Sequence, residues 1–231
     1  MALVLAYYSK YPRVAGDWTT HMIGVILPSR GLIFAEVVES LFDNLQGYDF
    51  KVYQATGLPI PDCENVPVEK ALEEGCSHLW FIEDDTVPPK GALEKMLSTE
   101  GDIVAIDYGV NGWGCITRDK MNSEIVWCGL GCTLVKSSVF KELEKPYFRD
   151  DMQLMANSSR PDFKTWVPAP KNRYGSQDIW FCMKALEKGF KITQVQGECK
   201  HLKLDSLGVP EENSGAHKIS EKQKITKHQF I

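Results

Sequence analysis

The sequence lacks several features that would each define a class of protein. Its seven cysteines are scattered without a CxxC pair, which argues against a zinc cluster or a disulfide framework and favours a reducing compartment. No apolar run is long enough to span a membrane, and the apolar segment at residues 2–6 is too short for the core of a signal peptide. There is no internal repeat and no low-complexity segment. These absences predict a cytoplasmic protein, in the host cytoplasm if it is viral.

The charge is also modest. A formal net charge of −5 over 231 residues argues against a general nucleic-acid coat. An apolar fraction of 43% and a charged fraction of 25% are typical of globular proteins, and the length suffices for one large domain. The polar, lysine-rich residues 205–231 predict a loosely held tail, so the domain is expected to occupy residues 1–204.

The first half of the chain alternates between strand-like and helix-like patterns. Continuous apolar runs predict strands at 22–27, 51–54 and 79–82. Apolar residues at a spacing of three and four predict helices over 33–45 and 65–74 between them. This order is typical of a parallel sheet covered by helices.

The second half is less regular. After a strand at 102–106, glycines interleave with short apolar runs, which predicts short and partly antiparallel strands. Ser137 or Ser138 is expected to cap a brief helix. Residues 145–175 have no clear period and predict a lid or binding loop. A helix is expected from residue 176, with a strand after it.

Three adjacent carboxylates, Glu83, Asp84 and Asp85, directly follow the apolar run at 79–82. They would repel one another unless a cation lies among them. The carboxyl end of a strand is also where α/β sheets bind ligands. Oxygen ligands suit Mg²⁺ or Mn²⁺, which makes this turn a candidate metal site. The alternative is a helix start, because acids are favourable there and Pro88 or Pro89 would be ordinary at the first helical position.

Together these motifs resemble those of GT-A glycosyltransferases, particularly family-2-like enzymes of bacteria and bacteriophages, over residues 22–202. Residues 27–31 are similar to the strand and loop that cradle the nucleotide, and residues 81–85 match the Asp-x-Asp signature, with Glu83 as the first acid. Residues 129–132 resemble the acceptor-side glycine segment. The chain departs from the pattern at Glu64, where the family often has Arg, and at Gln177, where a Glu-Asp pair usually opens a helix.

The resemblance implies an α/β fold of the GT-A, Rossmann-like type. A single domain would hold a central, mostly parallel sheet flanked by helices and a smaller antiparallel part on the acceptor side. Residues 22–107 would bind the nucleotide sugar, and residues 108–204 would bind the acceptor and carry the catalytic base. The implied reaction is metal-dependent transfer of a sugar from a nucleotide-diphosphate sugar, a UDP sugar first of all, to a hydroxyl group with inversion.

The resemblance also assigns roles to particular residues. It implies metal ligation by Asp85, His201 and Glu83, and proton removal by Asp178. The implied donor-binding residues are Pro28, Ser29, Arg30, Asn65, Glu83 and Asp84. The implied acceptor-side residues are Gly129, Gly131 and Trp180. An imidazole ligand favours Mn²⁺ over Mg²⁺. From local sequence alone, a surface histidine is the favoured interpretation of His201, which lies beside Lys200 and Lys203, and Asp178 is typical of a helix cap.

Two other functions fit the same residues. A nucleotidyltransferase would also place acids after a strand, although the loop at residues 28–31 is poor for gripping a triphosphate. A catalytically inactive module that binds nucleotide sugars or glycans would explain Glu83 and Gln177. The acceptor (a modified DNA base, a protein or a glycan) and the oligomeric state stay open.

Overall fold

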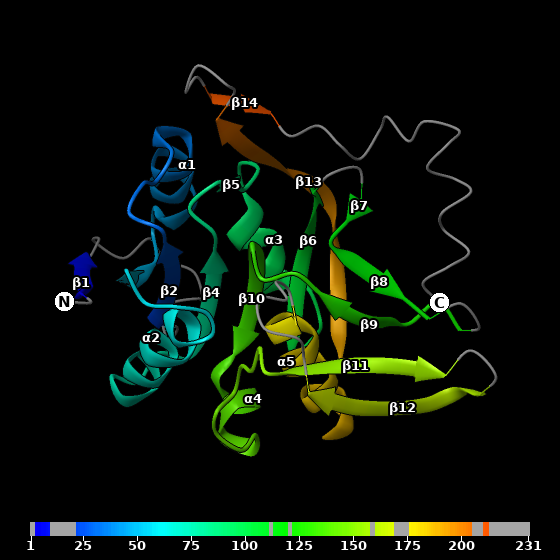
Figure 1. Cartoon of the computed structure of the whole chain (residues 1–231). Helices are drawn as coiled ribbons and strands as arrows, with labels where there is room; N and C mark the ends of the chain where they lie inside the picture. Colours follow the sequence, from blue (N-terminus) through cyan, green and yellow to red (C-terminus); the bar gives the residue numbers. More distant parts are fainter. Residues whose placement is uncertain are drawn as a thin grey trace.

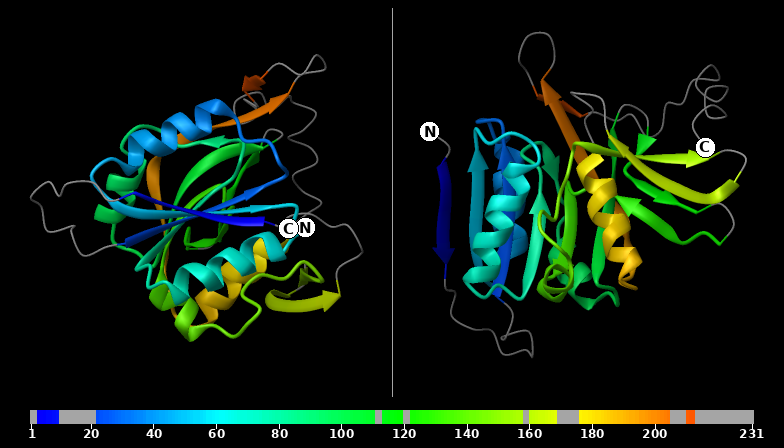
Figure 2. Two further views of the ribbon diagram at one scale, coloured as in Figure 1. Left: turned by 90° about the vertical axis from the view of Figure 1, so that its left-hand side faces the viewer. Right: turned by 60° about the horizontal axis from the view of Figure 1, so that its bottom comes forward.

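The computed structural model describes residues 3–9, 22–110, 113–119, 122–157, 160–168, 176–204 and 210–212. A large mixed sheet forms its centre, and helices cover both faces (Figures 1 and 2). The order of strands along the main path of the sheet is β1-β3-β2-β4-β10-β6-β13-β14, with β5 paired to β13 and β7 paired to β6. Two further pairs, β8–β9 and β11–β12, form separate two-stranded sheets.

The elements have the following bounds. The strands of the first half are β1 (Leu3–Ser9), β2 (Met22–Ser29), β3 (Asp49–Thr56), β4 (His78–Ile82), β5 (Thr86–Val87) and β6 (Ile103–Val110). Those of the second half are β7 (Trp113–Gly114), β8 (Ile116–Arg118), β9 (Ile125–Cys128), β10 (Cys132–Lys136), β11 (Met152–Asn157), β12 (Arg160–Pro168), β13 (Ile192–Leu204) and β14 (Pro210–Glu212). The helices are α1 (Ala35–Leu45), α2 (Asp62–Glu73), α3 (Ala92–Ser98), α4 (Ser137–Glu142) and α5 (Ser176–Glu187).

The central strands are apolar on both faces because helices cover both. On β4, Trp80 and Ile82 join one core, and Leu79 and Phe81 join the other. The first core packs α1 and α3 against the sheet, and the second packs α2, α4 and α5. Figure 2 (left) shows the resulting layers, with α1 on one side of the sheet and α2 and α5 on the other. This burial explains why the strand is a continuous apolar run rather than an alternating one.

The sheet is mostly parallel, with a reversal near its middle. Strand β2 runs parallel to β3 and β4, and β6 runs parallel to β13. Strand β10 lies antiparallel between β4 and β6, and β1 is antiparallel to β3. The predicted α/β fold, with a mostly parallel sheet, flanking helices and smaller antiparallel sheets, is confirmed. Consequently, β2, β4 and β6 end at the same edge.

Strand β13 extends past the end of β6 and reaches the edge of the sheet where β2, β4 and β6 end. Its parallel register with β6 shifts between Val195 and Glu198, so the strand changes course after its first half. Beyond this irregularity it pairs antiparallel with β5, placing His201 opposite Thr86. Residues far apart in the sequence therefore meet beside the turn after β4.

Some local predictions are wrong. The prolines after Val87 do not open a helix, because Thr86–Val87 pairs as β5 with β13 and α3 begins at Ala92. Neither Ser137 nor Ser138 is the N-cap of α4; that position is Lys136, and Ser137 Oγ donates a hydrogen bond to the Cys76 carbonyl.

The section expected to be an irregular loop over 145–175 contains the β11–β12 hairpin, whose pairing is not visible from local periodicity. Within the expected tail, Pro210–Glu212 forms β14 against β13; the remainder of that tail lies outside the described residues. None of the helices in the described ranges is long and apolar enough to cross a membrane.

Candidate metal and donor-binding site

The turn after β4 presents its acids at the carboxyl edge of the sheet. Neighbouring segments hold its backbone in place: Phe34 N donates to the Asp84 carbonyl at 3.1 Å, and Leu202 N donates to the Asp85 carbonyl at 2.8 Å. The first contact ties the turn to the loop before α1, and the second ties it to β13. The side chains of Glu83, Asp84 and Asp85 are therefore displayed from a fixed backbone.

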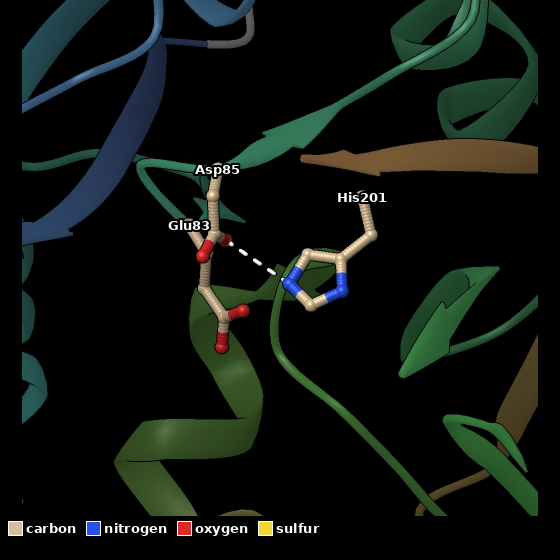
Figure 3. A group of neighbouring side chains, drawn as sticks. All are labelled: Glu83, Asp85 and His201. Atoms are coloured by element: carbon tan, nitrogen blue, oxygen red, sulfur yellow. Dashed lines mark ion pairs between the residues drawn. The ribbon is translucent and has the colours of Figure 1, made fainter. Parts of the chain in front are cut away.

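Glu83, Asp85 and His201 converge from these two segments (Figure 3). One ligand atom from each lies within 4.8 Å of the other two. His201 Nε2 is 3.4 Å from Asp85 Oδ1, and His201 Nδ1 is 3.0 Å from the Gly109 carbonyl. Because a carbonyl oxygen only accepts, Nδ1 carries the proton in that contact. Nε2 is thereby directed at the acids, in the orientation that a metal-ligating histidine needs.

This donor set is compatible with a divalent cation. Two carboxylates and an imidazole match the ligands that Mn²⁺ accepts, and the carboxylates alone match Mg²⁺. Because their ligand atoms lie within 4.8 Å of one another, Glu83, Asp85 and His201 are the residues that would hold such an ion.

Arg30 lies over the same acids from the end of β2. Its backbone N donates to Asp84 Oδ2 at 3.0 Å, and its Nη2 donates to Asp84 Oδ1 at 3.0 Å and to Asp85 Oδ2 at 2.8 Å. The Arg30 side chain is 79% exposed, whereas those of Asp84 and Asp85 are 6% and 14% exposed. Arg30 thus presents a solvent-facing positive charge beside Glu83, Asp85 and His201, which are called the metal group below.

Ser29 and Pro28 shape the turn that carries this arginine. The Ser29 hydroxyl accepts a hydrogen bond from Gly31 N at 3.0 Å and donates one to the Leu32 carbonyl at 3.3 Å. Gly31 has a φ of +111°, a conformation that favours glycine. Pro28 is opposite Ala55 in the parallel pairing with β3. In this structure both predicted donor-binding residues support the loop that places Arg30.

Burial and crowding perturb the protonation of the metal group. Burial raises the pKa of Glu83 to about 8, with further increases from the negative charges of Asp178, Asp85 and Asp84. Burial alone would raise the pKa of Asp85, but its hydrogen bond to His201 and the charges of His201 and Arg30 outweigh this and lower it. Burial opposes protonation of His201, but the Asp85 hydrogen bond and charge prevail and raise its pKa. At neutral pH Glu83 therefore carries a proton that a metal ion would displace.

Asp178 lies close to Glu83 although it comes from α5. Burial raises its pKa to about 7, against a hydrogen bond from the Leu130 backbone. Its Oδ1 is buried without a hydrogen-bond partner among the described residues. A carboxyl group with a pKa near neutrality is well suited to accept a proton from a hydroxyl group.

Glu64 on α2 and Gln177 on α5, where the chain departs from the family pattern, are in mutual contact. Gln177 donates a hydrogen bond to Glu64, and both residues are buried. Burial raises the pKa of Glu64 well above its ordinary value, and the charges of Asp178 and Glu83 raise it further. Sequence reasoning treated Glu64 as a lost arginine; its position beside the acids is a feature that only the packing of α2 against α5 reveals.

Gly129 and Gly131 leave room for the side chain of Tyr108, which a Cβ at either position would meet. Gly131 N donates to Tyr108 Oη at 3.0 Å, and the Gly131 carbonyl accepts from Glu83 N at 3.3 Å. A Cβ on Gly131 would lie 2.6 Å from Tyr108 Cζ, and one on Gly129 would also collide with this ring. The glycines thus allow Tyr108, which packs edge-on against His201, to lie beneath the metal group. Sequence analysis did not identify Tyr108.

Two other predicted site residues make contacts of their own. Asn65 exchanges two hydrogen bonds with the Phe148 backbone, at 3.0 and 3.1 Å, which hold that segment to α2. Trp180 packs against Trp166, and the cationic groups of Arg149 and Lys184 lie 4.9 and 5.0 Å from the centre of its ring. The structure does not bring Asn65 or Trp180 into contact with the metal group, so their donor and acceptor roles stay predictions.

No protein-family model matches the chain, and no curated protein matches it. Among solved structures, the chain is similar to A197 from STIV, with a TM-score of 0.55, 14% identity and coverage of 84% of this chain and 90% of that one. It also matches the catalytic domain of Drosophila β1,4-galactosyltransferase 7 at a TM-score of 0.49 and 15% identity, covering 91% of this chain and 81% of that one.

A third match is a Bacillus anthracis protein described as a putative glucose-1-phosphate thymidylyltransferase, at a TM-score of 0.41 and 13% identity, covering 78% of this chain and 89% of that one. At these identities the similarities concern the fold. The sheet order, with its antiparallel β10 and flanking helices, gives the mostly parallel α/β architecture that the sequence predicted.

Proposed function

We propose that this protein is a metal-dependent glycosyltransferase that moves a sugar from a nucleotide-diphosphate sugar, a UDP sugar first of all, to a hydroxyl acceptor. The observation that carries the proposal is the convergence of Glu83, Asp85 and His201 beneath the exposed Arg30, with Asp178 beside them. These groups offer a cation site, a diphosphate contact and a base at one edge of a GT-A-like sheet.

Each group has a distinct task in this proposal. A divalent ion, Mn²⁺ in preference to Mg²⁺, supplies positive charge where negative charge develops on the leaving diphosphate. Glu83, Asp85 and His201 hold the ion. Arg30 exchanges its contacts with Asp84 and Asp85 for the phosphate oxygens, which match its planar guanidinium. Asp178 accepts the proton of the attacking hydroxyl group, which implies in-line attack and inversion.

The remaining sequence-based assignments join the proposal unchanged. Residues 22–107 form the donor half, with Pro28, Ser29 and Asn65 shaping its binding surface. Residues 108–204 form the acceptor half, with Gly129, Gly131 and Trp180 on the acceptor side. The acceptor itself is a modified DNA base, a protein or a glycan.

The test is thermal unfolding with Mn²⁺ or Mg²⁺ against a panel of UDP-, GDP-, CMP- and TDP-sugars. Binding to the folded state raises Tm by mass action. We expect a rise with one nucleotide class that needs the metal and disappears in Asp85→Asn, which keeps the shape of the side chain but removes its charge. No metal-dependent rise with any member of the panel would contradict the proposal. Pyrophosphate release from a nucleoside triphosphate would indicate a nucleotidyltransferase instead.

A further inference from the structure

A cavity of about 580 Å³ lies at the edge of the sheet where β4 begins, opposite the edge that carries the metal group (Figure 1). Its lining comes from the start of β4, the end of β10 and the helices α2, α3 and α4. In the pairing of β10 with β4, Lys136 is opposite His78 at this edge, and Cys132 is opposite Ile82 at the other. The length of β4, about 13 Å, therefore separates the cavity from the acidic turn.

The size and the apolar part of this cavity suit a small ligand. Sites for small molecules typically have volumes of about 300–1,000 Å³ and combine an apolar wall with a few polar groups. Here the apolar wall includes Leu72 of α2 and Leu97 of α3. Leu72 packs against the core on one face of the sheet, and Leu97 packs against the core on the other. The cavity thus lies between the two helical layers at the start of β4.

The charged side chains of the lining are all basic. They belong to His78, Lys136 and Lys141, and no acidic residue of the described ranges is part of the lining. Lys141 is exposed and has no ion-pair partner in the part of the chain that the structure describes. Lys136 pairs with Asp102 at 3.4 Å, but Asp102 also accepts a hydrogen bond from Lys191 N at 3.0 Å. In a chain with a net charge of −5, this cavity therefore concentrates positive charge.

Three serine hydroxyl groups also line the cavity. Two are held by backbone groups, since Ser137 Oγ donates to the Cys76 carbonyl and Ser77 Oγ donates to the Met22 carbonyl at 3.3 Å. Ser138 is exposed, and its hydroxyl has no hydrogen-bond partner among the described residues. Ser138 is therefore the hydroxyl that can donate to a ligand.

The kind of positive charge indicates the kind of anion. Ser138 and Lys141 are three residues apart on α4, so their side chains lie on the same face of that helix. Ammonium groups attract an anion as point charges, without the planar geometry by which arginine matches a carboxylate. A phosphate monoester carries a charge of about −1.5 to −2 at pH 7 and three acceptor oxygens, so it can meet two lysines and a hydroxyl together. A carboxylate offers one charge and two oxygens.

We propose that this cavity binds a phosphate group through Lys136, Lys141 and Ser138. The phosphate is either inorganic or part of a small phosphate ester, since both offer the same oxygens; in an ester, the organic part contacts Leu72 and Leu97. The cavity lies at the opposite edge of the sheet from the metal group, so the proposal does not depend on the proposed function.

Lys141→Gln is the main test variant, because it removes a charge that has no ion-pair partner in the described ranges. Ser138→Ala removes the available hydroxyl. The matched control is Lys188→Gln, which makes the same change of charge at an exposed lysine outside the lining. Arg30→Gln is a second control, because phosphate bound beside the metal group would depend on Arg30. Circular dichroism and Tm establish that each variant folds.

Calorimetric titrations in EDTA, which keeps divalent ions away from the metal group, compare inorganic phosphate, phenyl phosphate, glucose 6-phosphate and benzoate. We expect Lys141→Gln to weaken the best phosphate ligand by about 5–10-fold and Ser138→Ala by about threefold, with both controls like wild type. An ester that binds more tightly than inorganic phosphate identifies an ester as the ligand, and equal affinities identify inorganic phosphate. The site is overturned if no phosphate binds, if benzoate binds as tightly, or if Lys141→Gln behaves like Lys188→Gln.

Amide chemical shifts locate the bound phosphate. In a nitrogen-15 NMR titration with the same ligand, we expect changes at His78 and residues 136–141 and none at Glu83 or Asp85. Changes confined to Arg30 and the acidic turn would place the phosphate beside the metal group and refute the cavity. Both measurements use neither metal nor nucleotide, so loss of the proposed glycosyltransferase function would leave this result standing, and the reverse also holds.

Discussion

Replacing Arg30 by glutamine should change the affinity for metal and the affinity for diphosphate in opposite directions. Arg30 Nη2 lies 2.8 Å from Asp85 Oδ2 and 3.0 Å from Asp84 Oδ1, so its positive charge competes with a metal ion for the same carboxylates. Removing that charge favours metal binding. It also removes the group proposed to contact the phosphates, which disfavours binding of the nucleotide.

The exposure of Arg30 sets the size of each effect. Because its side chain is 79% exposed, water screens its ion pairs, and exposed pairs contribute about 0.2–1 kcal/mol. We therefore expect Arg30→Gln to bind Mn²⁺ alone up to about fivefold more tightly. A hydrogen bond to a charged phosphate contributes about 1.5–3 kcal/mol, so UDP in saturating Mn²⁺ should bind about 10-fold more weakly or worse.

Isothermal titration at constant pH and ionic strength measures both constants. Arg118→Gln is the matched control, because it makes the same change of charge at an exposed arginine that contacts Gln194 and the Ser123 carbonyl. Subtracting its effect removes the contribution of net charge. The reasoning is refuted if Arg30→Gln shifts both affinities in the same direction, or if UDP binding equals that of the control.

Further predictions concern protonation and packing. Between pH 6 and 8, Mn²⁺ affinity should rise by up to about tenfold per pH unit for each proton that the ion displaces, one from Glu83, whose pKa is about 8, and one from His201, whose pKa is raised; titration calorimetry in two buffers would detect the released protons. Whereas the affinity for Mn²⁺ rises with pH, the Tm of the metal-free protein should fall between about pH 4.5 and about pH 8. In that window folded Glu83 keeps a proton that the unfolded chain, with its ordinary pKa of 4.5, has lost. Gly131→Ala should lower the free energy of unfolding by about 1–3 kcal/mol in urea denaturation, because the added Cβ would lie 2.6 Å from Tyr108 Cζ; an unchanged midpoint would show that the ring moves freely. Asn65→Ala should cost about 1–3 kcal/mol in the same assay, since it leaves the Phe148 backbone groups unpaired, and a stability equal to wild type would disprove that role.

The features that sequence predicted best are those that depend on neighbouring residues. The apolar run of β4 and the acids after it are contiguous, so both the strand and the candidate metal turn follow from local chemistry. Residue His201 is different. Its local sequence resembles a solvent-exposed segment, and only the resemblance to a family singled it out. Its contact with Asp85 depends on the pairing of β13 with β5, which no local pattern encodes.

The parts that sequence missed are set by tertiary packing. Glu64 belongs to a helix whose apolar pattern says nothing about α5, so its contact with Gln177 required the structure. Tyr108 reads as an ordinary strand residue, yet its hydroxyl lies against Gly131 and its ring against His201. The β11–β12 hairpin was missed because its pairing, rather than its composition, makes it regular.

The position of His201 on β13 also determines when during folding the metal group can exist. Glu83 and Asp85 follow β4, whereas His201 follows only after β6, β10 and α5 along the chain. A nascent chain that has just released β6 from the ribosome has both acids but no imidazole. The complete group forms when β13 adds to β6 and its far end reaches β5. In the proposed function, all three ligands can hold the metal ion only after β13 has docked on β6 and β5, so loading of the metal would depend on this late step of sheet assembly.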